Sequence, residues 1–125
     1  AYTPTTKTID SAKEVTEGAS YENAQTAFIQ VEAEDRDNEK SVRKNLRNLL
    51  KWIERKNQPN HIILHSFAHL SNSKADPEYT KTFLDNIEAW LKERGYSVFQ
   101  TPFGYFLDLT MEAPGFSLAR VFKEF

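Results

Sequence analysis

The part of the sequence that most constrains the fold is a short apolar run, His61-Ile62-Ile63-Leu64-His65-Ser66, between two longer segments with helical periodicity. The run follows the helix-stopping sequence Asn57-Gln58-Pro59-Asn60 and is too short to form a helix of its own. We therefore predict a buried strand over residues 61–66. A strand flanked in the chain by two helices favours a layered arrangement of sheet and helices.

Each flanking segment has an apolar stripe that would cover one face of a helix. We expect the first helix over residues 39–56, with Asn38 as its cap. The second begins at Asp76-Pro77, a capping residue followed by proline at the first helical position, and ends near Gly95. The stripes consist of Val42, Leu46, Leu49, Leu50 and Ile53 in the first helix, and Phe83, Leu84, Ile87, Trp90 and Leu91 in the second.

Further strands are predicted on both sides of this unit. The Thr-rich residues 2–9 and the segment 21–31 precede the first helix, while 96–100 and 105–111 follow the second. A short terminal helix is expected from about Ser117. With 125 residues, the chain is predicted to be a single α+β domain, a layered mixed β-sheet covered by two main helices.

Composition excludes several kinds of protein. The chain has no cysteine, which rules out a disulfide framework, a thiol nucleophile and a cysteine-based zinc site. No apolar run approaches about 18 residues and no secretory signal is visible, so we expect no membrane contact and a cytoplasmic location. The net charge of −2 argues against avid non-specific binding to nucleic acid but is compatible with a local basic face.

The three histidines, His61, His65 and His69, have a spacing that invites a metal site. In a strand, however, four residues span about 13 Å, whereas neighbouring ligands of one ion each lie at about 2 Å from it. We therefore expect no metal, and nothing else in the sequence indicates a cofactor.

His69 is a candidate catalytic residue, because it lies in the polar connection between the predicted strand and the second helix. Catalytic groups gather at such strand ends, and an imidazole can move a proton or donate a hydrogen bond to an ester. A histidine that only satisfies loop backbone is the alternative. A triad of Ser66 or Ser71 with His69 and Asp108 is not favoured, because no Gly-x-Ser-x-Gly elbow is present.

A basic stripe runs along the first predicted helix. Arg43, Arg47, Lys51 and Arg55 recur at intervals of four, with Lys44 and Lys56 beside them. This pattern is found where a helix contacts nucleic-acid phosphates and, somewhat more often, on an ordinary solvated helix surface. The carboxylates of Glu32, Glu34, Asp35 and Asp37 indicate a solvated acidic loop rather than a paired acid and base.

Four blocks are the most distinctive parts of the chain: Ala27-Phe28-Ile29-Gln30-Val31-Glu32, Phe67-Ala68-His69-Leu70-Ser71, Leu91-Lys92-Glu93-Arg94-Gly95 and Pro102-Phe103-Gly104-Tyr105. Their order and spacing resemble the N-terminal editing domain of archaeal threonyl-tRNA synthetases. The resemblance implies the fold of the D-aminoacyl-tRNA deacylases, a homodimer, and hydrolysis of serine mischarged onto threonine tRNA. The partners it implies are the aminoacylated 3′ end of tRNA and the catalytic and anticodon-binding domains of a synthetase.

The resemblance also implies a pocket for the aminoacyl-adenosine end of tRNA. Its substrate-binding residues would be Phe28, Ile29, Gln30, Val31, Glu32, Phe67, Ala68, Phe103, Gly104 and Tyr105. His69 would be the catalytic group, and Arg43, Arg47 and Lys51 would contact tRNA. In the family, the ribose hydroxyl of the substrate and a nearby lysine are thought to assist hydrolysis.

The chain departs from the family pattern beyond the Gly104-Tyr105 pair. Where the family continues with Tyr-Lys, this chain has Phe106 and Leu107, and Arg120 stands in place of a family glutamate. The first residue is Ala, which indicates a trimmed or partial chain, and the family's apolar opening strand is missing, so an exposed sheet edge is expected. Three hypotheses therefore stay open: a deacylase, a non-catalytic paralogue that binds aminoacyl-tRNA, and a structural dimerisation domain.

Overall fold

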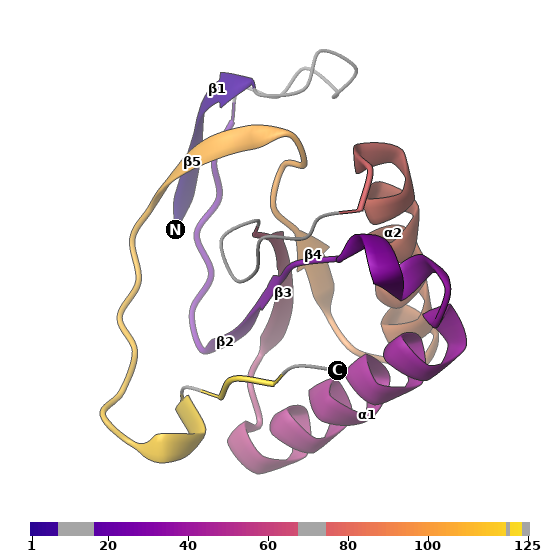
Figure 1. Cartoon of the computed structure of the whole chain (residues 1–125). Helices are drawn as coiled ribbons and strands as arrows, with labels where there is room; N and C mark the ends of the chain where they lie inside the picture. The colour runs from indigo at the N-terminus through magenta and orange to yellow at the C-terminus, as the bar shows by residue number, and fades with distance from the viewer. Residues whose placement is uncertain (8–16, 68–74, 120, 124–125) are drawn as a thin grey trace.

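The computed structural model describes residues 1–7, 17–67, 75–119 and 121–123 (Figure 1). Its elements follow the predicted order. They are β1 (Tyr2–Lys7), β2 (Ala24–Ile29), the 3₁₀ helix η1 (Ala33–Arg36), α1 (Glu39–Asn57), β3 (His61–Ser66), α2 (Pro77–Glu93), β4 (Val98–Gln100), β5 (Tyr105–Leu109) and the 3₁₀ helix η2 (Ser117–Ala119). The expected terminal helix is thus a single 3₁₀ turn.

The centre of the fold is a parallel sheet with the strand order β2-β3-β4. α1 connects β2 to β3 and α2 connects β3 to β4, and Figure 1 shows both helices on the same side of this sheet. Parallel strands need such crossover connections, because a short turn cannot return the chain to the start of the next strand. The predicted α+β class and the two covering helices are confirmed.

The predicted mixed sheet is divided into two parts. β1 and β5 pair antiparallel in a sheet of their own, which lies beside the parallel sheet on the side away from the helices (Figure 1). The division follows from the path of the chain after β4. Strand β4 has only three residues, and the chain then turns at Gly104, which has a φ of +84°. This turn directs β5 toward β1 and away from the edge of the parallel sheet.

The hydrophobic core lies between the parallel sheet and the two helices. Alternate strand residues face it, so Ile62 and Leu64 of β3 are buried against α2, whose Ile87 and Leu91 are 0% exposed. α1 contributes Leu46, Leu50 and Ile53, the buried members of its predicted stripe. In the described residues, neither helix is both long and apolar enough to cross a membrane.

Local sequence signals explain the limits of α2. The Asp76 carboxylate accepts a hydrogen bond from the backbone N–H of Tyr79 at 2.9 Å, and Pro77 occupies the first turn. At the other end, Gly95 has a φ of +88°, and the N–H groups of Gly95 and Tyr96 donate to the carbonyls of Lys92 and Leu91. This is the αL ending that glycine favours.

The start of α1 differs in detail from the prediction. Asn38 occupies the cap position, but its side chain makes no capping bond and instead donates to the carbonyl of Glu34 at 3.4 Å. The preceding turn, η1, brings that carbonyl within reach. α1 therefore begins without the side-chain cap that the sequence indicated.

Candidate functional site

The three parallel strands end at the same edge of the sheet, where the chain makes several connecting hydrogen bonds. Beyond β3, the N–H of Phe67 donates to the carbonyl of Ile29 at 2.8 Å. The N–H of Ala75 donates to Val31 at 2.8 Å, and Thr101, just after β4, donates to Leu64 at 3.0 Å. Binding sites in sheets with parallel strands gather at this edge.

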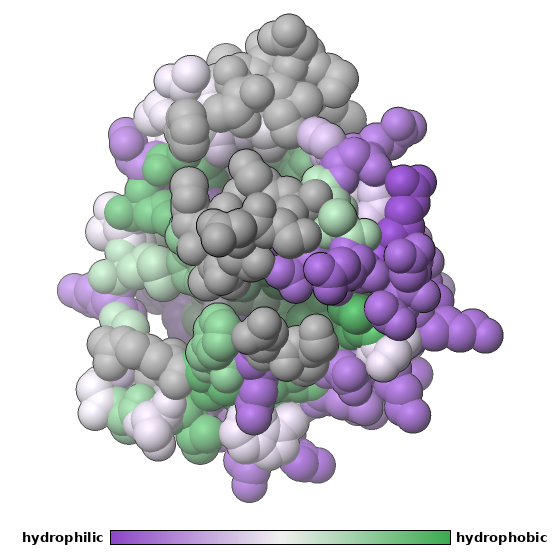
Figure 2. All heavy atoms as spheres, in the orientation of Figure 1, coloured by the Kyte–Doolittle hydropathy of each residue, from purple (hydrophilic) through white to green (hydrophobic). Residues whose placement is uncertain are grey.

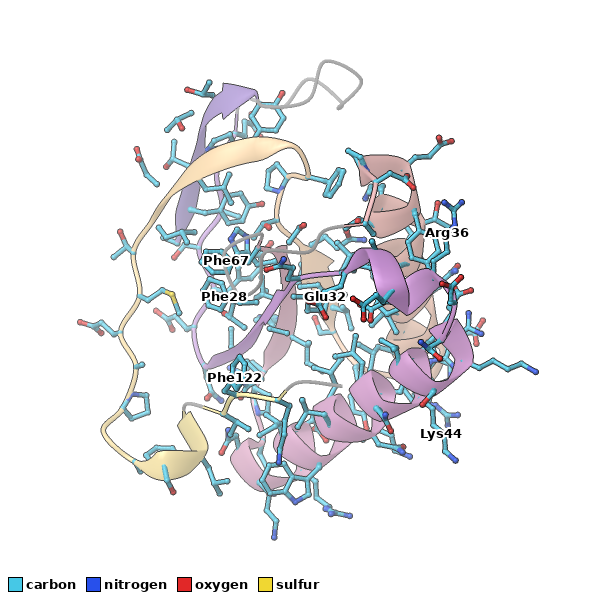
Figure 3. All side chains as sticks on the ribbon, in the orientation of Figure 1. Phe28, Glu32, Arg36, Lys44, Phe67 and Phe122 are labelled. Atoms are coloured by element: carbon cyan, nitrogen blue, oxygen red, sulfur yellow. The ribbon has the colours of Figure 1, made fainter. Side chains whose placement is uncertain are left out.

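A cavity of about 510 Å³ opens beside this edge, between β2 and α1. Its walls are mainly apolar, and the C-terminal segment Val121-Phe122-Lys123 closes one side. Figure 3 shows Phe28, Phe67 and Glu32 around the end of β2, with Phe122 across from them. The volume falls within the range of about 300–1,000 Å³ that is typical of sites for small ligands.

The structure brings two of the three predicted pocket blocks to this cavity. Residues 28–32 and Phe67 line it. Phe103, Gly104 and Tyr105 do not; they form the half-buried turn into β5, where Tyr105 pairs with Lys7 of β1. Ala68, His69 and Arg120 lie outside the described residues.

Leu107, which stands where the family has a lysine, also lies away from the cavity. It is half-buried in β5 and pairs with Pro4 of β1. Among the described residues, the one basic side chain that lines the cavity is that of Lys123, from the C-terminal segment. Lys123 was not among the predicted site residues, because its position depends on the path of the chain after η2.

An aromatic cluster of Phe28, His65 and Phe67 covers the ends of β2 and β3. The Phe28 ring centroid lies 5.1 Å from that of His65 and 5.5 Å from that of Phe67, both edge to face. The ring Nδ1 of His65 lies 2.8 Å from the hydroxyl of Thr101, and burial lowers the pKa of His65 below its usual value. Phe28 and Phe67 also line the cavity, where their rings could stack against a flat ring such as a nucleobase.

His65 and Thr101 do not line this cavity, and neither was among the predicted site residues. The signal that could have found His65 is the parallel register, which pairs it directly with Phe28. β2 and β3 have equal length and are joined by one crossover helix. The sequence predicts their register only if the two strands are assumed to lie side by side in the sheet.

The acidic segment after β2 is partly ordered into η1 rather than being a fully solvated loop. The backbone N–H of Glu32 donates to the Asp35 carboxylate at 2.8 Å, as in a capping box, and both side chains line the cavity. Burial raises the pKa of Asp35 above its usual value, an effect that the hydrogen bond from Glu32 opposes. Glu34 and Asp37 are exposed, as predicted for the segment as a whole.

The structure offers no metal-binding group of three or more His, Asp or Glu side chains among the residues that it describes. His61 is at the opposite end of β3 from His65, and its Nδ1 lies 2.9 Å from the Ser97 hydroxyl.

The basic stripe of α1 has members in different environments. Arg43 pairs with Glu39 at 3.7 Å, Arg47 stacks over the Trp90 ring at 4.7 Å, and Lys51 is exposed. Lys44 projects away from the cavity in Figure 3. In the view of Figure 2, hydrophilic residues cover the side formed by η1 and α1, whereas hydrophobic residues gather toward the cavity.

Fold and cavity together define a class: a small α+β domain with a mainly apolar, ligand-sized cavity between the edge strand of a parallel sheet and a covering helix. Within that class, the chain belongs to the family of archaea-specific editing domains of threonyl-tRNA synthetase, which it matches over residues 1–125.

Individual relatives agree with this assignment. The threonine–tRNA ligase of Methanocaldococcus jannaschii is 31% identical over 97 residues, which make up 78% of this chain and 16% of the relative. The ligase of Methanosphaera stadtmanae is 31% identical over 114 residues, or 90% and 18% of the two lengths. That of Pyrococcus furiosus is 34% identical over 95 residues, or 76% and 15%. The chain therefore spans less than a fifth of the curated relatives that it matches.

Proposed function

We propose that this editing domain hydrolyses the ester bond of serine mischarged onto threonine tRNA. The observation that carries the proposal is the cavity of about 510 Å³ between β2 and α1, lined by Phe28, Glu32 and Phe67 from two of the blocks that resemble the family. A cavity of this size is large enough for an aminoacyl-adenosine end.

The aromatic and acidic groups suggest how such a substrate would bind. Phe28 and Phe67, which line the cavity, supply aromatic surface for an adenine ring. The carboxylates of Glu32 and Asp35 line the same cavity and would attract the ammonium group of the aminoacyl moiety. The remaining apolar wall would exclude bulk water, which strengthens both interactions.

Hydrolysis requires a placed water, a group that assists proton transfer, and stabilisation of the developing oxyanion. His69 is the proposed proton-transfer group; it comes two residues after Phe67, which lines the cavity. In place of the family lysine, Lys123 is the proposed source of positive charge, because it lines the cavity whereas Leu107 does not.

A second candidate function is a paralogue that binds aminoacyl-tRNA without hydrolysing it. The scarcity of cations favours this alternative, because Lys123 is the one basic side chain that lines the cavity among the described residues. The two proposals share the cavity and differ only in turnover. For either, the proposed partners are the aminoacylated 3′ end of tRNA, a second copy of the chain, and the other domains of a threonyl-tRNA synthetase.

The deciding experiment measures deacylation of seryl- and threonyl-tRNA(Thr) by the purified chain. Editing predicts rapid loss of serine with threonine retained. Loss of neither ester, from a folded sample that still binds a seryl-adenosine analogue, would overturn hydrolysis and support the binding paralogue.

Variants then assign the roles. His69→Ala should lower turnover by about 100-fold or more if His69 transfers a proton, while His61→Ala, at the far end of β3, should leave it unchanged. Lys123→Ala should also lower turnover, and Leu107→Lys should not restore it, because position 107 lies outside the cavity. Restoration by Leu107→Lys would show that the cation acts from β5 instead.

A further inference from the structure

Positive charge is concentrated on one helix of this acidic chain. α1 carries seven Lys and Arg residues against two Glu, a net charge of +5, although the whole chain has a net charge of −2. The apolar stripe of α1 faces the core and the cavity. The cations therefore occupy the remaining surface of the helix, which gives the domain one strongly basic face.

Two arginines at this face are arranged around a single aromatic ring. The guanidinium carbon of Arg47, from α1, lies 4.7 Å from the centroid of Trp90 in α2, and that of Arg94, at the end of α2, lies 4.1 Å from it. Stacking on an indole ring restricts the motion of each guanidinium group. The two helices thus hold a pair of cations close together on one ring.

The positive charge of this pair is not neutralised by hydrogen-bonded acids in the described residues. Arg47 Nε is buried and has no hydrogen-bond partner there. Burial, followed by the charges of Arg43 and Arg94, lowers the pKa of Arg47, and the nearby Glu93 opposes this shift. Arg43 is already paired with Glu39. Adjacent guanidinium groups of this kind are stabilised when an anion binds between them.

Arg36 provides an internal comparison. It also stacks on an aromatic ring, with its guanidinium carbon 5.1 Å from the centroid of Tyr79, but it forms an ion pair with Asp76 at 3.2 Å. Its position is explained by contacts within the domain. The Arg47–Trp90–Arg94 cluster has the same stacking without such an acid partner, and this difference indicates an external ligand.

We infer that Arg47, Trp90 and Arg94, together with the exposed lysines of α1, form a docking site for the phosphate backbone of RNA. A row of cations along a helix can contact several phosphates of one RNA backbone, whereas a single acidic side chain of a protein would contact only part of the row. This inference rests on the proposed function in that the RNA is the tRNA whose acylated end enters the cavity. It adds a contact with the tRNA body, on a face separate from the cavity.

The test uses unacylated tRNA(Thr), whose binding to the purified chain requires no hydrolysis. Arg47→Gln and Arg94→Gln should each weaken binding about tenfold at about 0.1 M salt and lower the slope of log K against log salt by about 1. Arg47→Lys keeps the positive charge but loses the planar guanidinium group that stacks on Trp90. Its tRNA affinity should therefore lie between those of the unchanged protein and Arg47→Gln.

The matched control is Arg36→Gln, which removes the same charge and a similar stacking contact. It should leave tRNA affinity unchanged, and thermal unfolding should establish that all variants are folded. Because Arg94 is exposed at the end of α2, its variant tests the site even if Arg47→Gln unfolds the domain. Unchanged tRNA affinity in Arg94→Gln and in folded Arg47 variants would overturn the inference.

Two additional measurements separate this inference from the proposed function and from another partner. Phe67→Ala should impair hydrolysis but not the binding of tRNA(Thr) that lacks its 3′-terminal adenosine, so a domain that hydrolyses nothing can still support or contradict the docking site. Poly-glutamate serves as the competing probe. If it binds through Arg47 and Arg94 while tRNA does not, the face binds acidic protein and the RNA assignment is wrong.

Discussion

The two sides of the domain differ in how completely they bury apolar residues. Around α2, β3 and β4 the packing is nearly complete, with Ile87 and Leu91 at 0% exposure. Around β2, α1 and the C-terminal segment it is open: every residue of β2 is half-buried, and Phe122 is 66% exposed. The α2 side can supply most of the stability, and the β2 side leaves room for a ligand.

This difference follows from the position of each strand. β3 lies between two strands and under two helices, so both its backbone and its side chains are covered. β2 is at the edge of the parallel sheet, with β3 on one side only. An edge strand beside a cavity can accommodate a substrate with little repacking of the core.

The largest expected effect is on the α2 side. Ile87→Ala should lower the free energy of unfolding by about 2–5 kcal/mol, because it creates a cavity in complete packing. Ile29→Ala, at the existing cavity, should cost only about 1 kcal/mol. Urea unfolding of the two variants measures both, and equal losses would contradict the proposed division of roles.

A smaller effect is expected at the start of α2. Asp76→Ala removes the capping bond to Tyr79 and the ion pair with Arg36, and should cost about 1 kcal/mol of stability. Asn38→Ala is the matched change at α1, where no capping bond exists, and should cost much less. Thermal unfolding compares them; a larger loss for Asn38→Ala would reverse the expected order.

His65 lies between Phe28 of β2 and Thr101, just after β4, and its burial should make the stability of the domain depend on pH. Its folded-state pKa lies below the ordinary value of 6.5, so protonation favours the unfolded state. Stability should be constant above about pH 6.5 and should decrease as the pH falls toward the folded-state pKa. His65→Gln should weaken this decrease in urea unfolding measured between pH 7 and pH 5, and His61→Gln should retain it.

The smallest effect on stability is expected at the open side. Phe122→Ala should change the free energy of unfolding by less than about 0.5 kcal/mol, since the side chain is largely exposed. Because Phe122 lines the cavity, the same change should weaken binding of a seryl-adenosine analogue. Isothermal titration and unfolding measured on one sample separate the two effects, and a large loss of stability would mean that this segment belongs to the core.

Local signals made part of this structure predictable. Asp76-Pro77 and Gly95 gave the limits of α2, and the six-residue apolar run gave β3, because each depends on residues close in sequence. The division of the sheet was not predictable in this way. It depends on where the chain goes after a three-residue β4.

The candidate site was predictable only in part for the same reason. Phe28–Glu32 and Phe67, which the resemblance assigned to a substrate pocket, line the cavity, and their role in binding stays a prediction. Lys123 lines the cavity because of the path of the C-terminal segment, which local sequence does not determine. Likewise, the stacking of Arg47 on Trp90 depends on the angle at which α1 and α2 cross. The apolar periodicity of each helix does not predict that angle.

The concentration of charge on α1 has a consequence for the rate of association. Since α1 carries +5 and the whole chain −2, the rest of the chain carries −7, so the domain is an electric dipole. The field of a polyanion would rotate such a molecule before contact and turn its basic helix toward the RNA. Productive encounters would then be more frequent than random collisions allow, and this advantage would disappear as salt is added.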